Sequence, residues 1–273
     1  MSMAAKRIIK QQKCTLSEQA LIEFLRKYPM PKEVKIMLPN NNQNIFDAPA
    51  GYVGLYVHAF TESNFRIPIH PLILEFLQYY QVHISRLNPF GLAKLTTYIV
   101  VCKAYGYEPM LNVLRGFINL CPGGDWLTLG KRSEPDVPCL ITKPFANIRK
   151  WKGLFFYVQD TIIPPKYPAL LDKDFRFDEK RFDDPLPHFV RSYPLYQRLE
   201  RHPFDVQTFP EPILFMAGIV DHWEGSPLKP GIMCEGKSMY IPIQNKVNDL
   251  SDDIYLFFFV VAGMAFRNFV VAR

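Results

Sequence analysis

The clearest regularity in the chain is a set of apolar stripes at helical spacing, each preceded by a proline. Pro71 is followed by apolar residues at positions i, i+1, i+4, i+5 and i+8 of one helix face. Proline suits the first helical position because the N–H that it lacks has no partner there. Asn88-Pro89 has the same pattern, with Asn88 as an N-cap residue and Pro89 at the first helical position. Gly106 follows near the expected end of this helix, where a left-handed residue is common. The stripes are Leu72, Ile73, Phe76, Leu77, Tyr80 and Leu92, Leu95, Ile99, Cys102.

Other helices follow from the same signals. Pro109 is expected to open a helix that runs until Pro122-Gly123-Gly124 stops it. Thr15 with Glu18 forms a capping-box pattern for an earlier helix that ends before Pro29. Later helices are predicted from about Pro194 to Glu200 and from Pro212 to Trp223.

Strands are fewer in this pattern. Trp126 to Leu129 and Leu154 to Val158 are predicted as two aromatic strands joined by a basic loop, and Val34 to Leu38 as a short strand. Tyr52 to Phe60 alternates poorly, which favours a short helix ending near Thr61. The fold class is therefore predicted as α+β and mostly helical, with short helices and a small two-stranded aromatic β element.

The organisation along the chain is expected to have one main domain. The predicted parts are a basic tail (1–14), an N-terminal helix and linker (15–44), the main domain (45–170), a loop-rich helical extension (171–253) and an apolar segment (254–273). We expect the extension to pack on the main domain. The apolar segment is short for a membrane span, which needs about 20 residues, and it contains Arg267. A buried final element is therefore favoured over membrane insertion.

Composition excludes some classes of protein. Hydrophobic residues make up 48% and charged residues 21%, which is ordinary for a globular chain and argues against disorder throughout. Twenty-four prolines against 14 glycines indicate short elements with stiff connections. The five cysteines form no CxxC pair, which argues against a zinc knuckle and a disulfide framework. With no secretory signal in the first residues, we expect an intracellular protein of the nucleus or cytoplasm.

The ordered set of elements resembles a plant family of gypsy-type transposase domains found in and beside LTR retrotransposons. The resemblance covers roughly residues 48–170. It rests on an apolar segment ending at Pro71, the Leu87 to Pro89 cap, Gly106 with Pro109, a Trp strand, and Trp151, Lys152, Phe155, Phe156 and Val158 in a second strand. It implies a protein derived from a mobile element, and the family name does not by itself imply catalysis. Residues 254–273 depart from the family pattern, which suggests a frame change or readthrough there.

Catalytic chemistry finds little support in the residues. A transposase site needs three carboxylates around two metal ions. None of the aspartates follows a convincing run of buried strand residues, and Asp160 after the second aromatic strand comes nearest. The histidines show no metal-binding spacing. We therefore assign no catalytic residue, no metal and no cofactor. The aspartates weighed are Asp125, Asp136, Asp160, Asp172, Asp174, Asp183, Asp184 and Asp221.

The basic loop between the two aromatic strands is the candidate for nucleic-acid binding. Its cations could neutralise phosphates, and Phe145 and Trp151 could stack on bases. The competing interpretation is that Trp151 and Phe155 anchor the strand in the core, and that Glu134 and Asp136 dilute the positive charge. The candidate nucleic-acid-binding residues are Lys131, Arg132, Arg149, Lys150 and Lys152.

Three functions stay open from the sequence. The favoured one is a non-enzymatic, retrotransposon-derived protein of structural or gag-like type with weak nucleic-acid binding and self-association. The second is a metal-dependent transposase or integrase. The third is a membrane-associated protein held by residues 254–273, and a membrane partner is the least favoured. A net charge of +6 permits an acidic partner without requiring one.

Overall fold

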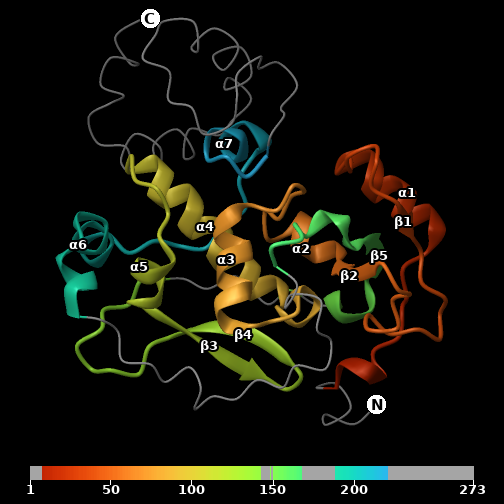
Figure 1. The fold of residues 1–273 in the computed structure, drawn as a ribbon, viewed down its shortest axis with the longest axis horizontal. Helices are drawn as coiled ribbons and strands as arrows, with labels where there is room; N and C mark the ends of the chain where they lie inside the picture. The colour runs from red at the N-terminus through yellow and green to blue at the C-terminus, as the bar shows by residue number, and fades with distance from the viewer. Residues whose placement is uncertain (1–7, 143–147, 149, 168–187, 221–273) are drawn as a thin grey trace, which may run out of the picture.

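The computed structural model describes residues 8–142, 148, 150–167 and 188–220, which form an α+β fold that is mostly helical (Figure 1). The fold class predicted from the sequence is confirmed. The helices are α1 (Glu18–Lys27), α2 (Val57–Thr61), α3 (Pro71–Tyr80), α4 (Pro89–Ala104), α5 (Leu111–Arg115), α6 (Pro194–Arg201) and α7 (Glu211–Met216). The strands are β1 (Ile36–Met37), β2 (Tyr52–Tyr56), β3 (Ile118–Gly123), β4 (Trp126–Lys131) and β5 (Phe155–Gln159). Short 3-10 turns include η2 (Ile9–Gln11), η3 (Ile84–Arg86), η4 (Trp151–Gly153), η5 (Asp160–Ile162) and η8 (His188–Ser192).

The two central helices form where the proline-led stripes predict them. α3 follows His70, whose Nδ1 accepts a hydrogen bond from the backbone N–H of Leu72 (3.2 Å). α4 follows Asn88, whose side chain accepts one from the N–H of Gly91 (2.8 Å). Gly106 has a φ of 78°, the left-handed conformation that closes a helix at little cost because glycine has no Cβ.

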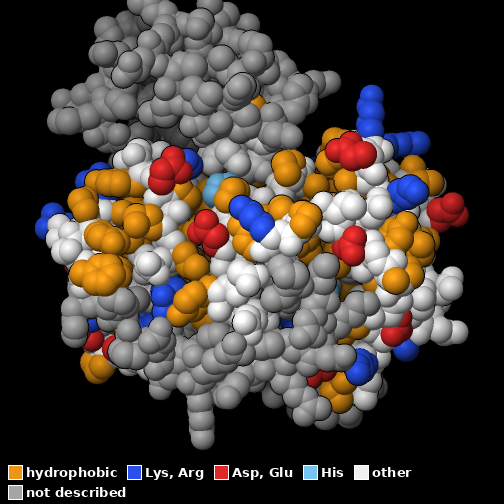
Figure 2. Space-filling view, viewed as in Figure 1, with side chains coloured by type: hydrophobic (Ala, Val, Ile, Leu, Met, Phe, Trp, Pro, Cys, Tyr) orange, Lys and Arg blue, Asp and Glu red, His pale blue; other side chains and the backbone are white. Residues whose placement is uncertain are grey.

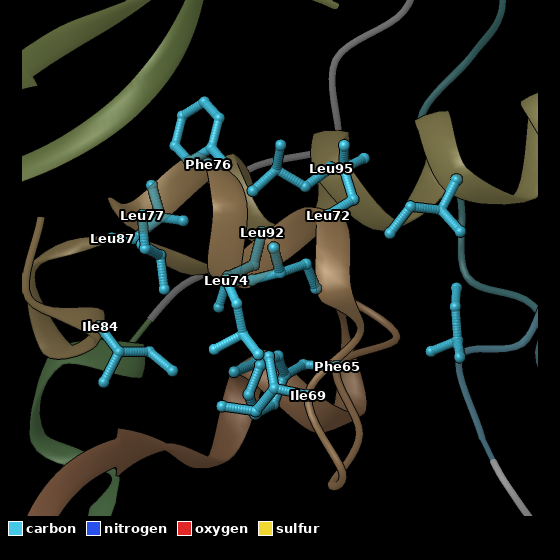
Figure 3. Close-up of a cluster of buried hydrophobic side chains, with 14 of the residues drawn as sticks. Phe65, Ile69, Leu72, Leu74, Phe76, Leu77, Ile84, Leu87, Leu92 and Leu95 are labelled. Atoms are coloured by element: carbon cyan, nitrogen blue, oxygen red, sulfur yellow. The ribbon is translucent and has the colours of Figure 1, made fainter. Parts of the chain in front are cut away.

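Side chains of α3, α4 and the segments beside them meet in one apolar cluster (Figure 3). Burying a large apolar side chain contributes about 1.5–3 kcal/mol. The cluster is therefore a main source of stability for this part of the fold. Its labelled members, all at most 6% exposed, are Phe65, Ile69, Leu72, Leu74, Phe76, Leu77, Ile84, Leu87, Leu92 and Leu95.

β5 is the central strand of a three-stranded antiparallel sheet with the order β1-β5-β2. Phe155–Val158 are all buried, so the strand appears in the sequence as a continuous apolar run instead of an alternating one. Phe156 contacts Phe24 of α1 (ring centroids 5.3 Å apart) and Phe60 of α2 (6.0 Å). The two helices therefore pack against the same strand.

The two aromatic strands predicted from the sequence exist but do not form one element. β4 pairs with β3 in a separate antiparallel hairpin, with Gly123 opposite Trp126 and Ile118 opposite Lys131. The prediction of a helix from Pro109 to Pro122 is wrong in its second half, because α5 ends at Arg115 and the chain continues as β3. A short apolar stretch suits either structure, and the partner strand decides between them. Gly124 (φ 80°) forms the predicted turn.

The short helix predicted for residues 52–60 is also half wrong. The stretch starts as β2, paired along its length with β5, and continues as α2. A Cβ on Gly54 would lie 2.1 Å from Cγ1 of Ile45, so glycine lets another segment cross the strand closely. Burial of nearly the whole strand removes the alternation that would have identified it.

The N-terminal segment packs against the rest of the fold. Ile9 and Cys14, expected within a basic tail, are 1% and 2% exposed. The capping box predicted at Thr15 is wrong, because the N-cap of α1 is Ser17, whose Oγ accepts from the N–H of Ala20 (3.2 Å). Thr15 instead donates from its N–H to the carbonyl of Gly153 (2.8 Å).

The segment from α6 to α7 packs against the middle of the chain. The ring of Tyr196 stacks on Phe117, with centroids 4.3 Å apart. Asn64 donates to the carbonyl of Gln207 and accepts from the N–H of Phe209, both at 2.8 Å. α6 confirms the predicted helix from Pro194, and α7 is shorter than the predicted one.

Some predictions fall outside the described residues. They are those on residues 171–187 and 221–273, including the apolar segment 254–273, and those on Lys143, Phe145 and Arg149. Within the described part of the chain, no helix is both long and apolar enough to cross a membrane.

Candidate nucleic-acid interface

Two buried tryptophans lie beneath the candidate interface. Trp126, at the turn end of the β3–β4 hairpin, contacts Trp151 of η4 with ring centroids 5.3 Å apart. The Trp126 indole N–H donates to the hydroxyl oxygen of Tyr56 (2.8 Å), and burial raises the pKa of that phenol. Trp126 and Trp151 are 1% and 6% exposed. The structure therefore favours the anchoring interpretation of Trp151 over base stacking.

Lys150 and Lys152 lie on one turn beside this pair of tryptophans. Lys150 is exposed and has a left-handed backbone (φ 60°), which turns the chain into η4. The ammonium of Lys152 lies 4.1 Å from the centroid of the Trp126 ring and 5.7 Å from that of Trp151. An ammonium over an indole face is attracted by the ring quadrupole, so the tryptophan pair positions this cation.

The N-terminal segment brings two further lysines to the same region. The N–H and hydroxyl of Thr15 both donate to the carbonyl of Gly153, at 2.8 and 3.2 Å. A Cβ on Gly153 would lie 3.1 Å from the carbonyl oxygen of Lys13, so the backbone of the N-terminal segment and that of η4 are in close contact. At the hairpin turn the N–H of Ile9 donates to a carboxylate oxygen of Asp125 (2.9 Å). Lys10 and Lys13, both exposed, therefore belong to a segment whose backbone contacts Asp125, next to Trp126, and Gly153, close to Trp151.

The structure separates Lys131 and Arg132 from this region. Lys131 lies at the opposite end of β4 from Trp126, five residues and roughly 17 Å away along the strand. Arg132 is 5% exposed, and its guanidinium bonds the carbonyl of Arg115 (3.2 Å) and the side chain of Glu134. The hydrogen bond from Arg132 lowers the pKa of Glu134. Arg132 therefore makes contacts inside the protein, while Lys131 is exposed.

Of the five predicted residues, the structure thus brings together Lys150 and Lys152, and Arg149 lies outside the described residues. Sequence reasoning did not connect Lys10 and Lys13 to them, because the first residues had the composition of a tail. The buried Ile9, Cys14 and Leu16 form an apolar pattern that could have indicated a packed segment.

The described aspartates weighed for catalysis lie in separate places. The carboxylate of Asp125 accepts from Ile9, and that of Asp136 pairs with Arg191 (2.6 Å). Asp160 opens η5 after β5. Among the described residues, no group of three or more His, Cys, Asp or Glu side chains is placed to hold a metal ion.

The described cysteines are free thiols. Cys102, inside α4, is completely buried, and burial raises its pKa, while Cys121 is half-buried on β3. A protonated, inaccessible thiol is inert, so Cys102 acts as a small core residue, as expected from its stripe.

Part of the chain is similar to a family of mobile-element proteins. Residues 55–122, from the end of β2 to the end of β3, match the family described as "Putative gypsy type transposon". A stretch of 126 residues is 24% identical to the meiosis-specific protein ASY2 of Arabidopsis thaliana. That stretch is 45% of this chain and only 9% of the plant protein. No solved structure matches the chain.

Proposed function

We propose that this chain, whose residues 55–122 match the family described as "Putative gypsy type transposon", is a non-enzymatic, retrotransposon-derived protein of gag-like type that binds nucleic acid. The name of the matched family supports the origin in a mobile element. The binding function is supported by one observation, the placement of Lys150 and Lys152 together on an anchored turn. Lysines held at fixed positions neutralise phosphates and release counterions, which supplies most non-specific affinity for nucleic acid.

Self-association is the second part of a gag-like role, and exposed apolar side chains around α5 support it. Met110, just before α5, is 40% exposed. The turn η8 contacts α5, and its residue Phe189 is 55% exposed. Hydrophobic side chains gather on the side of the molecule that carries α5 and α6 (Figure 2). Cations and acids are interspersed over the visible face (Figure 2).

The experiment is a binding titration of the full chain with single- and double-stranded DNA and RNA at two salt concentrations. Lys150→Gln with Lys152→Gln removes two charges and keeps the side-chain stems, and we expect at least a severalfold loss of affinity that is larger at low salt. The matched control is Lys32→Gln with Lys35→Gln, two exposed lysines near the other end of β5. Sedimentation of the same samples measures self-association at micromolar concentration.

No binding to any of these nucleic acids would overturn the binding function. An equal loss in the control pair would mean that net charge, and not this turn, is responsible. A strictly monomeric chain at all concentrations and salts would remove the gag-like assembly role.

A further inference from the structure

The candidate interface contains cations from two distant parts of the chain and two aromatic rings that are covered. Lys150 and Lys152 come from the turn before β5, and Lys10 and Lys13 come from the N-terminal segment. The rings beside them, Trp126 and Trp151, are at most 6% exposed. A ligand at this surface would therefore meet the positive charges of the lysines, while the faces of the Trp126 and Trp151 rings are covered.

The N-terminal segment is held at both ends of its contact with the interface. Near Lys10, the N–H of Ile9 bonds Asp125, and the Ile9 side chain is buried. Near Lys13, the N–H of Cys14 donates to the carbonyl of Gln43 (3.0 Å) and that of Thr15 to Gly153 (2.8 Å). The backbone that carries Lys10 and Lys13 is therefore positioned before any ligand arrives, which reduces the entropy lost on binding.

We propose that Lys10 and Lys13 join Lys150 and Lys152 in one surface that binds the sugar–phosphate backbone of nucleic acid, with little preference for single or double strands or for base sequence. The proposal rests on the proposed function and adds both the second half of the site and its mode of recognition. Backbone contacts fix position without reading bases, whereas single-strand preference normally comes from aromatic rings that stack on bases. Here the two rings at the site are already packed against each other and against Tyr56.

One acidic residue at this surface, Asp125, is already engaged in hydrogen bonds. The Asp125 carboxylate accepts from Ile9, and Arg86 donates to the carbonyl of the same residue (3.4 Å). Arg86 in turn lies 5.3 Å from the ring centroid of Phe46. A cation therefore lies beside this acid, and Asp125, Arg86 and the four lysines together carry a net positive charge.

The test compares four forms of the full chain: wild type, Lys10→Gln with Lys13→Gln, Lys150→Gln with Lys152→Gln, and the control Lys32→Gln with Lys35→Gln. Each is titrated with a mixed-sequence DNA duplex and with one of its single strands, from about 50 to 200 mM salt. The slope of log K against log salt measures the number of phosphates neutralised, at about −0.9 per contact on duplex and about −0.7 on single strands. Circular dichroism and urea unfolding establish that each variant is folded.

We expect both lysine pairs to weaken binding to duplex and single strand alike. Each should reduce the salt slope on duplex by up to about 1.8, two contacts at 0.9 each, while the control keeps the wild-type slope. If the variant Lys10→Gln with Lys13→Gln binds as tightly as wild type while Lys150→Gln with Lys152→Gln binds more weakly, this inference is overturned and the proposed function stands. A preference of more than tenfold for the single strand would overturn the backbone mode. No binding by wild type would overturn both.

Discussion

His70 shows how burial turns one cap residue into a pH-sensitive element. It lies before α3, and its Nδ1 accepts the N–H of Leu72, which requires an unprotonated nitrogen. Burial is the main cause that lowers the pKa of His70 from 6.5 to about 4, and the nearby Lys103 acts in the same direction while Glu108 opposes it. The neutral imidazole therefore belongs to the folded state over most of the pH range.

This residue predicts the direction of a pH effect. Between pH 6.5 and about 4 the unfolded chain binds a proton at His70 that the folded chain does not. The free energy of unfolding should therefore fall as pH is lowered through this window. His70→Asn, which keeps a capping side chain, should flatten that part of the slope. Urea unfolding at several pH values measures it, with His202→Asn at an exposed histidine as the control. An unchanged slope in His70→Asn would contradict the assignment.

At the scale of elements, the start of α4 combines two local signals with one tertiary contact. The Asn88 side chain caps the helix through Gly91, and its own N–H donates to the carbonyl of Leu127 in β4 (2.9 Å). Pro89 occupies the first helical position. The cap can be removed without touching the backbone bond to the hairpin, which makes this position suitable for measuring local stabilisation.

Asn88→Ala should lower the free energy of unfolding by about 1 kcal/mol, the usual cost of losing a side-chain cap. Asn88→Asp keeps an oxygen acceptor at the same place and should cost much less. Both are measured by urea denaturation at neutral pH. Equal destabilisation by the two substitutions would show that the side-chain acceptor is not the source of the effect.

At the scale of the whole molecule, the matched domain is enclosed by parts of the chain outside it. α4 is buried on most of its circumference, as expected of a helix that is apolar all round. It contacts β4 and α7, and both follow residue 122. Arg66 bonds Glu211 and the carbonyls of Phe60 and Phe65, which ties α7 to the turn before α3.

Residues 45–170 produced alone should therefore lack a cooperative unfolding transition and bind a dye for exposed apolar surface. They lose α1, α6 and α7, and with them the packing of Phe24 on Phe156 and of Tyr196 on Phe117. Residues 8–220 keep these contacts and should unfold cooperatively. Calorimetry and near-UV circular dichroism compare the fragments. A cooperative transition in residues 45–170 would contradict this view.

The candidate site was predictable only in part, because burial and contacts between distant segments cannot be seen in the local sequence. Lys150 and Lys152 were identified because they adjoin a tryptophan in an aromatic strand. Arg132 looked identical in sequence to an exposed cation, yet it is buried against Glu134 and Arg115. The segment that carries Lys10 and Lys13 contacts Asp125 and Gly153, which lie more than a hundred residues further along the chain, and no local pattern reports such a contact.

The sequence by itself determined the features that depend on a few adjacent residues. The prolines and polar caps located α3 and α4, and Gly106 and Gly124 located their turns, because these residues restrict or free their own backbone. Only the tertiary structure decided which strands pair, that residues 118–123 form β3, and which distant segments contact each other. Strand pairing and surface proximity depend on hydrogen bonds and contacts between distant segments, so they are properties of the packed chain.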